Sequence, residues 1–321
     1  MAGRRMGIIA FLFCLCLFLT PGRVHAVSTA EAKDAISPEK ACTLSLTYRC
    51  NGTTFSDVPV NLYKIADVSA DYQYTLTEPF VPSGLVLNGI QSIGEWNVIR
   101  GTLETYIVAN HIEETFAAMT DRSGQVCFEA LNPGLYLAVN GNIASCSFDA
   151  ALVSLPGLGV DGLWQYQVTA TPKGKEIPPA EPDEKIEYKV LKLWRGDNGQ
   201  SCRPESIQVE LFRNGTICQT VRLSKENNWS YRWMAENDGA NWTVSESEVP
   251  AGYVMTVEKR GTTFVLTNTR PADDPPSGEE LPPADSPQTG DSSSALLYTV
   301  LMYISGSILV ILGLTGKRKC A

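Results

Sequence analysis

Alternation of apolar and polar residues dominates two long stretches of the chain. In residues 42–172, segments such as "CTLSLTYRC" and "GQVCFEAL" alternate and are separated by turn signals such as "DRSG". In residues 186–270, "YKVLKLW" and "TTFVLTNT" alternate in the same way. Because side chains of a strand point to alternate faces, this pattern predicts an all-β fold with two immunoglobulin-like β-sandwich domains.

One segment of the first region departs from this alternation. In "GTLETYIVANHI" we predict a helix capped by Thr102, with Leu103, Tyr106 and Ile107 on one face, inserted into the first sandwich. His111 lies near the end of this segment. It is the only histidine after residue 26, so a Ser-His-Asp or Cys-His enzyme would have to use it. A surface or packing role is favoured, and we predict that the protein is not an enzyme.

Uncharged apolar runs occur near both ends of the chain. The first follows two arginines and precedes "VHA", which predicts a secretory signal peptide at residues 1–26. The second, residues 295–314, is long enough to be a transmembrane helix, and the cationic tail at 315–321 is expected to stay in the cytoplasm. The residues between the two runs are therefore expected outside the cell.

Two segments rich in proline and acidic residues bracket the second region. We interpret residues 173–185 as a linker and residues 271–290 as a stem, because such composition cannot bury a core. The net charge of −9 argues weakly against a nucleic-acid partner. No CxxC pair is present and one histidine remains, so neither a metal nor a cofactor is predicted.

Six cysteines lie in the part of the chain expected outside the cell. An even number in an exported chain suggests disulfides, although free buried thiols are the alternative. The pairing cannot be deduced from the sequence. The candidates are Cys42, Cys50, Cys127, Cys146, Cys202 and Cys218.

Three strands of the second region each place one polar residue on the side of large apolar neighbours. Lys192 alternates with apolar residues in the first strand, Glu246 in a late strand and Asn268 in the last. Together they could form an amide bond. Burial favours a neutral lysine amine and a protonated Glu246, which would polarise the Asn268 carbonyl and relay a proton to departing ammonia. Two alternatives stay open: the side chains reach water at strand ends, or a one-residue slip replaces Lys192 by Lys189.

The second region resembles a B-type domain of the collagen-adhesin family (CnaB). The similarity is carried by "KLWRGDNGQSCRPESIQVELFRNG", "NNWSYRW", "WTVSESEVPAGY" and "LTNT". The resemblance implies a CnaB-type sandwich in which Lys192, Glu246 and Asn268 supply the lysine, the catalytic acid and the asparagine of an intramolecular isopeptide bond.

The first region is similar, more loosely, to the N-terminal domain of sortase-assembled Gram-positive pilins. "VNLYKIADV" and "TDRSGQVCFEALNPGLYLAV" carry that similarity. An isopeptide set is not expected in this region, because Arg49 stands where a lysine would be needed and "YQVTATP" has no asparagine.

"SPQTGD" comes just before the apolar run at 295–314 and resembles the LPxTG cell-wall sorting signal. The recognition residues would be Ser286, Pro287, Gln288, Thr289 and Gly290. The resemblance implies that a sortase thiolate attacks the Thr289 carbonyl and transfers it to a peptidoglycan precursor or to a lysine of another pilin subunit.

Lys173, in "VTATPKG", is similar to the lysine that accepts the next pilin subunit, although the usual tyrosine is Thr171 here. A solvated linker charge is the alternative. We therefore expect a cell-wall-anchored pilin or pilin-like protein on the extracellular surface. A monomeric adhesin whose first domain binds host extracellular matrix or glycan is the second interpretation.

Overall fold

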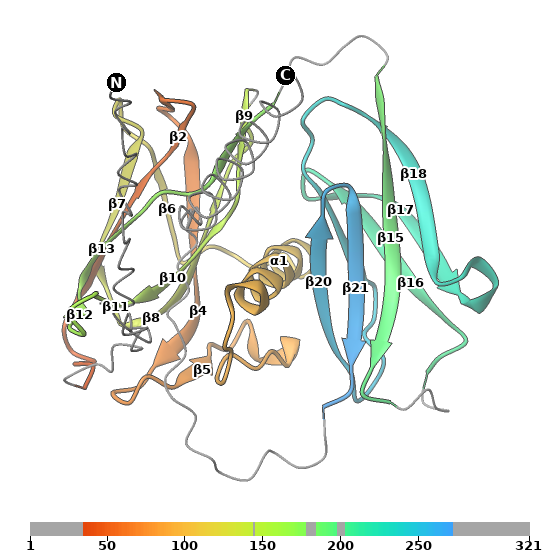
Figure 1. The fold of residues 1–321 in the computed structure, drawn as a ribbon, viewed down its shortest axis with the longest axis horizontal. Coiled ribbons are helices and arrows are strands. Elements are labelled where there is room, and N and C mark those ends of the chain that lie inside the picture. Colours follow the sequence, from red (N-terminus) through yellow and green to blue (C-terminus); the bar gives the residue numbers. More distant parts are fainter. Residues whose placement is uncertain (1–34, 144, 178–183, 198–202, 272–321) are drawn as a thin grey trace, which may run out of the picture.

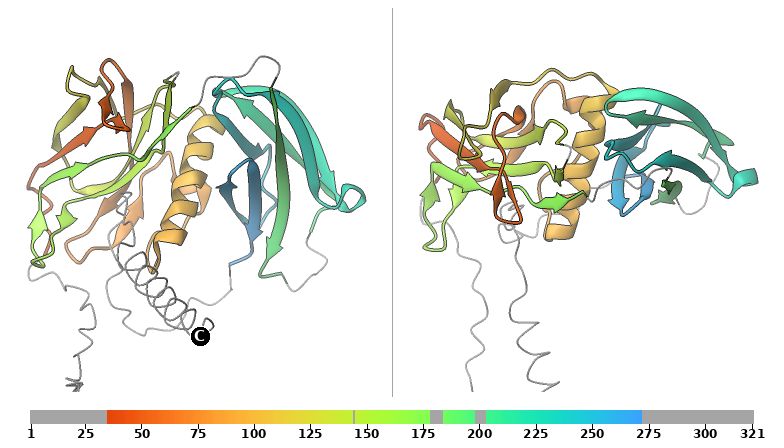
Figure 2. Two further views of the ribbon diagram at one scale, coloured as in Figure 1. Left: turned by 45° about the horizontal axis from the view of Figure 1, so that its top comes forward. Right: turned by 90° about the horizontal axis from the view of Figure 1, so that it is seen from above.

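The computed structural model describes residues 35–143, 145–177, 184–197 and 203–271. They form two β domains, and helix α1 (Ile93–Ala109) of the first domain lies between the sheets of the first and the second (Figures 1 and 2). The described part is mostly β, which confirms the predicted fold class in its coarse form.

The first domain contains α1, a short 3₁₀ helix η1 (Val81–Ser83) and strands β1 to β14. The strands are β1 (Cys42–Thr47), β2 (Arg49–Cys50), β3 (Thr53–Thr54), β4 (Pro59–Val68), β5 (Tyr74–Leu76), β6 (Phe116–Met119), β7 (Gln125–Leu131), β8 (Gly134–Asn140), β9 (Cys146–Phe148), β10 (Ala151–Leu155), β11 (Gly157–Leu158), β12 (Trp164–Gln165), β13 (Gln167–Ala170) and β14 (Gly174–Glu176).

Two sheets and the helix make three layers in the first domain. One sheet has the order β13-β1-β7, and the other has the order β10-β8-β4-β5 with β6 also paired to β4. Apolar side chains such as Leu44 and Leu62 fill the space between the sheets. The opposite face of the larger sheet packs on α1 through a second core that includes Leu137 and Leu103. The larger sheet is therefore covered on both faces, and apolar residues are needed on both.

Helix α1 begins earlier than the sequence analysis predicted. Its N-cap is Ser92, whose hydroxyl accepts from the Glu95 N–H while the Glu95 carboxylate accepts from the Ser92 N–H. This S-x-x-E capping box satisfies N–H groups that the first turn leaves without partners. Thr102 is thus not a cap but a buried residue in the middle of the helix, and its hydroxyl donates to the Val98 carbonyl at 2.7 Å.

The second domain consists of two sheets that enclose one apolar core. Its elements are β15 (Lys185–Arg195), β16 (Ser206–Arg213), β17 (Thr216–Ser224), η2 (Lys225–Asn227), β18 (Ser230–Glu236), β19 (Trp242–Glu246), β20 (Val254–Arg260) and β21 (Thr263–Thr269). The sheet orders are β18-β15-β21-β20 and β17-β16-β19. The first strand, β15, and the last, β21, are therefore neighbours, and they run parallel.

Helix α1 covers the edge strand β20 of the second domain. The buried Val257 N–H donates to the Thr102 hydroxyl oxygen at 2.9 Å. A Cβ atom on Gly101 would lie 3.2 Å from the Val257 carbonyl oxygen, so the absence of a side chain allows the close approach. An edge strand exposes backbone groups that can pair with another chain, and the helix occupies this one.

Replacing Thr102 by valine is expected to loosen this contact. The variant keeps the shape of the side chain but leaves the Val257 N–H buried without an acceptor, which costs about 1–3 kcal/mol. Amide hydrogen exchange at Val257 should then be roughly tenfold faster or more. Thr105→Val, on a buried threonine of the same helix, is the control. Equal protection of Val257 in both variants would contradict the role given to Thr102.

One predicted segment differs from the structure, and several others lie outside the described residues. Within the predicted linker, residues 174–176 form β14, paired with β9. Among the described residues, no helix is both long and apolar enough to cross a membrane. The predicted signal peptide, the apolar run 295–314 and the segment 286–290 lie outside the described residues.

Candidate functional site

Lys192, Glu246 and Asn268 come together from three strands of the second domain. In the parallel pair β15–β21, Lys192 is opposite Leu266 and Asn268 is opposite Trp194, so the lysine and the asparagine are two positions apart on neighbouring strands. Glu246 is the last residue of β19, in the facing sheet. The site thus lies between the two sheets.

The Glu246 carboxyl group contacts both of the other side chains. Its Oε1 atom lies 2.9 Å from Lys192 Nζ, and its Oε2 atom accepts a hydrogen bond of 3.0 Å from Asn268 Nδ2. The three residues are 3%, 5% and 0% exposed, in the order Lys192, Glu246, Asn268. One carboxyl group therefore bridges an amine and a carboxamide away from water.

Burial changes the chemistry of the amine. It lowers the pKa of Lys192 to about 8, although Glu246 acts in the opposite direction, and Arg203 adds a smaller lowering effect. Removing an ammonium ion from water costs several kcal/mol, and this cost shifts the Lys192 equilibrium toward the neutral amine. The Lys192 ammonium has one further described acceptor, the Leu193 carbonyl oxygen at 3.2 Å.

One contact differs from the sequence expectation. We expected the Asn268 carbonyl oxygen to face Glu246, but the amide nitrogen occupies that position. Among the described residues, Asn268 Oδ1 has no hydrogen-bond partner. The reason is that Lys192 and Asn268 approach the two oxygens of the same carboxyl group, and each presents an N–H donor to it.

Aromatic side chains cover the amine. Lys192 Nζ lies 4.4 Å from the centre of the Trp194 ring, a cation–π distance, and Trp194 in turn packs edge-on against Trp229 and Tyr253.

The buried side chain of Asp197 holds the residues around the Trp194 ring in place. Asp197 accepts two hydrogen bonds from Arg203, at 2.5 and 2.6 Å, and one from the Tyr253 hydroxyl at 2.9 Å. Arg203 also lies 5.7 Å from the Trp194 ring. Asp197 therefore holds Arg203 and Tyr253 in place. Both of these residues contact the Trp194 ring that covers Lys192.

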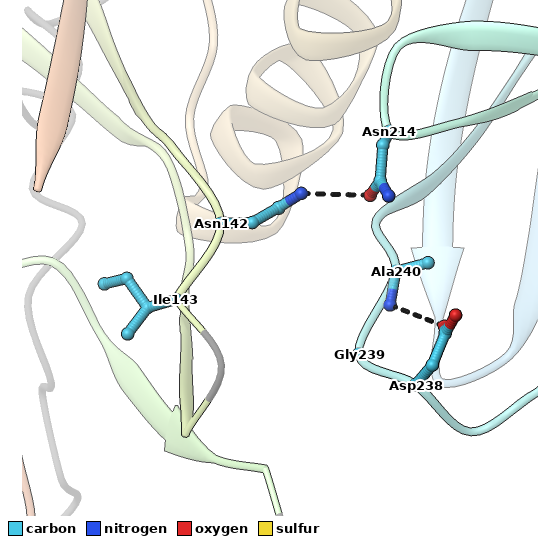
Figure 3. A pocket seen from close by; sticks show the side chains of 6 residues that line it. All are labelled: Asn142, Ile143, Asn214, Asp238, Gly239 and Ala240. Atoms are coloured by element: carbon cyan, nitrogen blue, oxygen red, sulfur yellow. Dashed lines mark hydrogen bonds between the residues drawn. The ribbon is translucent and has the colours of Figure 1, made fainter.

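A hollow of about 290 Å³ lies at the other end of the second domain, beside the first (Figure 3). Its six lining residues are Asn142, Ile143, Asn214, Asp238, Gly239 and Ala240. Asn142 Nδ2 donates to Asn214 Oδ1 across it at 3.0 Å. Glu246 ends β19, whereas this hollow adjoins the residues before its start, so the two sites are distinct.

The remaining candidate residues are dispersed. His111 is exposed, just after α1, and Lys173 is exposed, just before β14. In the described part of the chain, no group of acids, histidines and cysteines could hold a metal ion. Arg49 lies in β2 and is exposed, so it does not occupy the place of a core lysine. The corresponding buried positions of β1 carry Leu44 and Leu46.

The described cysteines are free thiols. Cys42, Cys50 and Cys146 are buried, Cys127 and Cys218 are exposed, and Cys202 lies outside the described residues. Sequence reasoning could not tell which of them are close to one another.

Residues 188–269, which make up most of the second domain, match the model of the Cna protein B-type domain. The match covers well under half of the chain. No curated protein matches the chain at a significant level.

Solved structures similar to the chain come from Gram-positive surface proteins. A single B repeat unit of the collagen-binding protein Cna of Staphylococcus aureus is 15% identical, with 73% of this chain and 99% of that chain covered and a TM-score of 0.26. The major pilin SpaD of Corynebacterium diphtheriae is 14% identical, with 73% and 65% covered and a TM-score of 0.28. The minor pilin of Streptococcus agalactiae is 16% identical, with 74% and 100% covered and a TM-score of 0.24. At these identities and TM-scores the similarity assigns no function to this chain.

Proposed function

We propose that the chain is a pilin-like surface protein whose second domain forms an amide bond between Lys192 and Asn268. The observation that carries this proposal is the Glu246 carboxyl group within 3.0 Å of both the amine and the carboxamide in a dry core. The match to a Cna B-type domain over the same residues supports it.

The reaction begins with a proton transfer from the Lys192 ammonium to Glu246 Oε1, which leaves a neutral pair. The free amine attacks Cγ of Asn268, and a C–N bond forms as the carbonyl π electrons move to Oδ1. Glu246 donates a proton to Nδ2 and takes one from Nζ, so the carboxyl group is restored. The C–Nδ2 bond then breaks and ammonia leaves. Because folding holds the groups in contact, effective molarities of roughly 10⁵ M or more are available, and no cofactor is needed.

The product explains why such a costly arrangement would be kept. The reaction converts a buried ion pair into a neutral amide, which removes the cost of holding two charges out of water. It also links the first and last strands of the domain, which are neighbours in one sheet. A pulling force would then pass from Lys192 directly to Asn268, and the intervening strands would carry none of it.

Intact mass spectrometry tests this proposal. Condensation releases one ammonia, so the wild-type chain should be about 17 Da lighter than the sequence of the same processed chain requires. Glu246→Gln has nearly the same shape but cannot relay the proton, and it should show the full mass. A wild-type mass equal to the sequence mass would exclude the bond.

Anchoring to the cell wall is the second part of the proposal. A sortase would cleave after Thr289 within Ser286–Gly290 and join Thr289 to a peptidoglycan precursor or to a lysine of another pilin subunit. Lys173 is exposed, as an acceptor lysine must be. Mass spectrometry of material released from the wall would show Thr289 in amide linkage. The absence of any peptide that joins a threonine to Lys173 would exclude a shaft subunit.

A chain that cannot form the bond should show pH-dependent stability. In Asn268→Ala the Lys192 amine stays free, and its pKa of about 8 lies below the unfolded value of about 10.4. Between these values the unfolded state binds more protons, so stability rises with pH, by about 3 kcal/mol in total. Below about pH 8 the Lys192 amine is protonated in both states, so the folded state bears the full cost of burying its charge.

Urea unfolding from pH 7 to pH 11 measures this change. Adding Lys192→Met to Asn268→Ala removes the titrating amine and should abolish the rise. If the two variants depend on pH identically, the pKa of Lys192 is not lowered by its burial.

A further inference from the structure

Strands β2 and β9, which carry Cys50 and Cys146, lie at the same end of the first domain (Figure 1). Cys146 begins β9 and is 1% exposed, and Cys50 ends β2 and is 8% exposed. They are 96 positions apart in sequence, yet Cys50 is close enough to contribute to the raised pKa of the Cys146 thiol.

Strand β14 brings the two cysteines together. Glu176 of β14 is the register partner of Cys146, and its carboxylate accepts a hydrogen bond of 2.7 Å from Asn51, the residue after Cys50. A Cβ atom on Gly174 would lie 3.0 Å from the Cys50 Cβ atom. The β2–β3 hairpin is thus packed on the β9–β14 pair, with Cys50 on one side of this contact and Cys146 on the other.

We propose that Cys50 and Cys146 form a disulfide in the exported protein. The oxidant is an external disulfide, such as that of an oxidised dithiol protein. The Cys50 thiolate attacks one sulfur of that disulfide and displaces a thiol. The Cys146 thiolate then attacks the Cys50 sulfur and releases the second thiol. Two electrons and both protons pass to the external disulfide, which is reduced to two thiols.

The surroundings of the pair fit a structural disulfide that closes during folding. Burial, with a smaller contribution from Cys50, raises the pKa of Cys146 to about 12, so its thiol reacts slowly once it is enclosed. Cys50 adjoins the exposed turn at Asn51 and Gly52, and a small opening of that hairpin would admit the oxidant.

The other described cysteines are placed differently. Cys127 is exposed and opposite Ser45, whose hydroxyl donates to its sulfur at 3.6 Å. Cys42 is enclosed in the core between the sheets, and Cys218 is exposed in the second domain. Neither Cys42 nor Cys218 lies in the region formed by β2, β9 and β14.

This disulfide would give the first domain its own covalent connection. The first domain also pairs an early and a late strand in parallel, β1 with β13, but Leu44 and Leu46 occupy the inward positions of β1. An amide cross-link is therefore not available between these two strands, and the proposed disulfide ties a segment just after β1 to β9, which pairs with the last strand of the domain.

The test is a non-reducing peptide map of the exported full chain, denatured with N-ethylmaleimide to block free thiols. We expect one linked peptide pair that contains Cys50 and Cys146, is lost on reduction and persists in Cys127→Ser. In addition, a reductant should lower the melting temperature of the wild type by more than about 5 °C but leave Cys50→Ser/Cys146→Ser unchanged.

Recovery of both cysteines as maleimide adducts, or linked to other cysteines, would overturn the inference. The proposed disulfide requires that the chain is exported, and export is part of the proposed function. The ammonia loss is measured on the same sample, so a chain with the amide bond but blocked Cys50 and Cys146 contradicts the disulfide alone. A chain with the disulfide but the full sequence mass contradicts the amide bond alone.

Discussion

A wild-type chain stretched between its ends is expected to release about 250 Å less contour length than its Asn268→Ala variant. The amide bond between Lys192 and Asn268 would carry the force past residues 193–267, which could not extend. In the variant these residues unfold and lengthen the chain. Single-molecule force spectroscopy on the full chain measures the difference directly.

The first domain serves as the internal reference in that experiment, because the substitution does not touch it. Its unfolding step should have the same length in both chains. A second-domain step of full length in the wild type would contradict the mechanical role, whatever the sorting segment does.

Loss of the cross-link is also expected to lower the melting temperature of the second domain by about 20 °C in Asn268→Ala. A cross-link that closes a loop of this size limits the unfolded chain by about 4 kcal/mol, by analogy with a disulfide. In a domain of this size, 1 kcal/mol corresponds to roughly 4–8 °C. Differential scanning calorimetry of the full chain measures the shift.

Glu246→Gln is the matched variant for this measurement. It keeps Asn268 and Lys192 in the chain but removes the acid, so it should melt close to Asn268→Ala. If either variant melts within a few degrees of the wild type, the bond either is absent or adds no stability.

The inward direction of the Lys192 side chain could be predicted from the sequence, because buried and partly exposed residues alternate along this part of β15. Val190 and Lys192 are buried, whereas Leu191 and Leu193 between and beyond them are partly exposed. Period-two reasoning works there because only one face of the strand is covered. Lys189, the alternative left open by a one-residue slip, is partly exposed, whereas Lys192 is buried.

Burial along the strand does not distinguish Glu246 or Asn268 from their neighbours. All of β19 is buried, so Thr243 and Ser245 are as enclosed as Glu246. Residues 264–268 of β21 are buried as well. Alternation with large apolar neighbours pointed to these two residues and the family resemblance strengthened the choice, but the two sheets that enclose them were needed to show how they meet.

Contacts between segments that are far apart in sequence could not be predicted from the alternation of residues, for a different reason. The Thr102–Val257 hydrogen bond and the Cys50–Cys146 contact each depend on where a helix or a hairpin docks, and neither leaves a local signal. The start of α1, in contrast, could have been predicted from the sequence, because Ser92 and Glu95 have the spacing of a capping box.

The most direct measurement of the central claim is tandem mass spectrometry of a tryptic digest of the wild-type chain. The account predicts a branched peptide in which the Lys192 side chain is joined to Asn268, with no tryptic cleavage after Lys192. Recovery of two linear peptides, one cleaved at Lys192 and one with an intact Asn268 carboxamide, would contradict it.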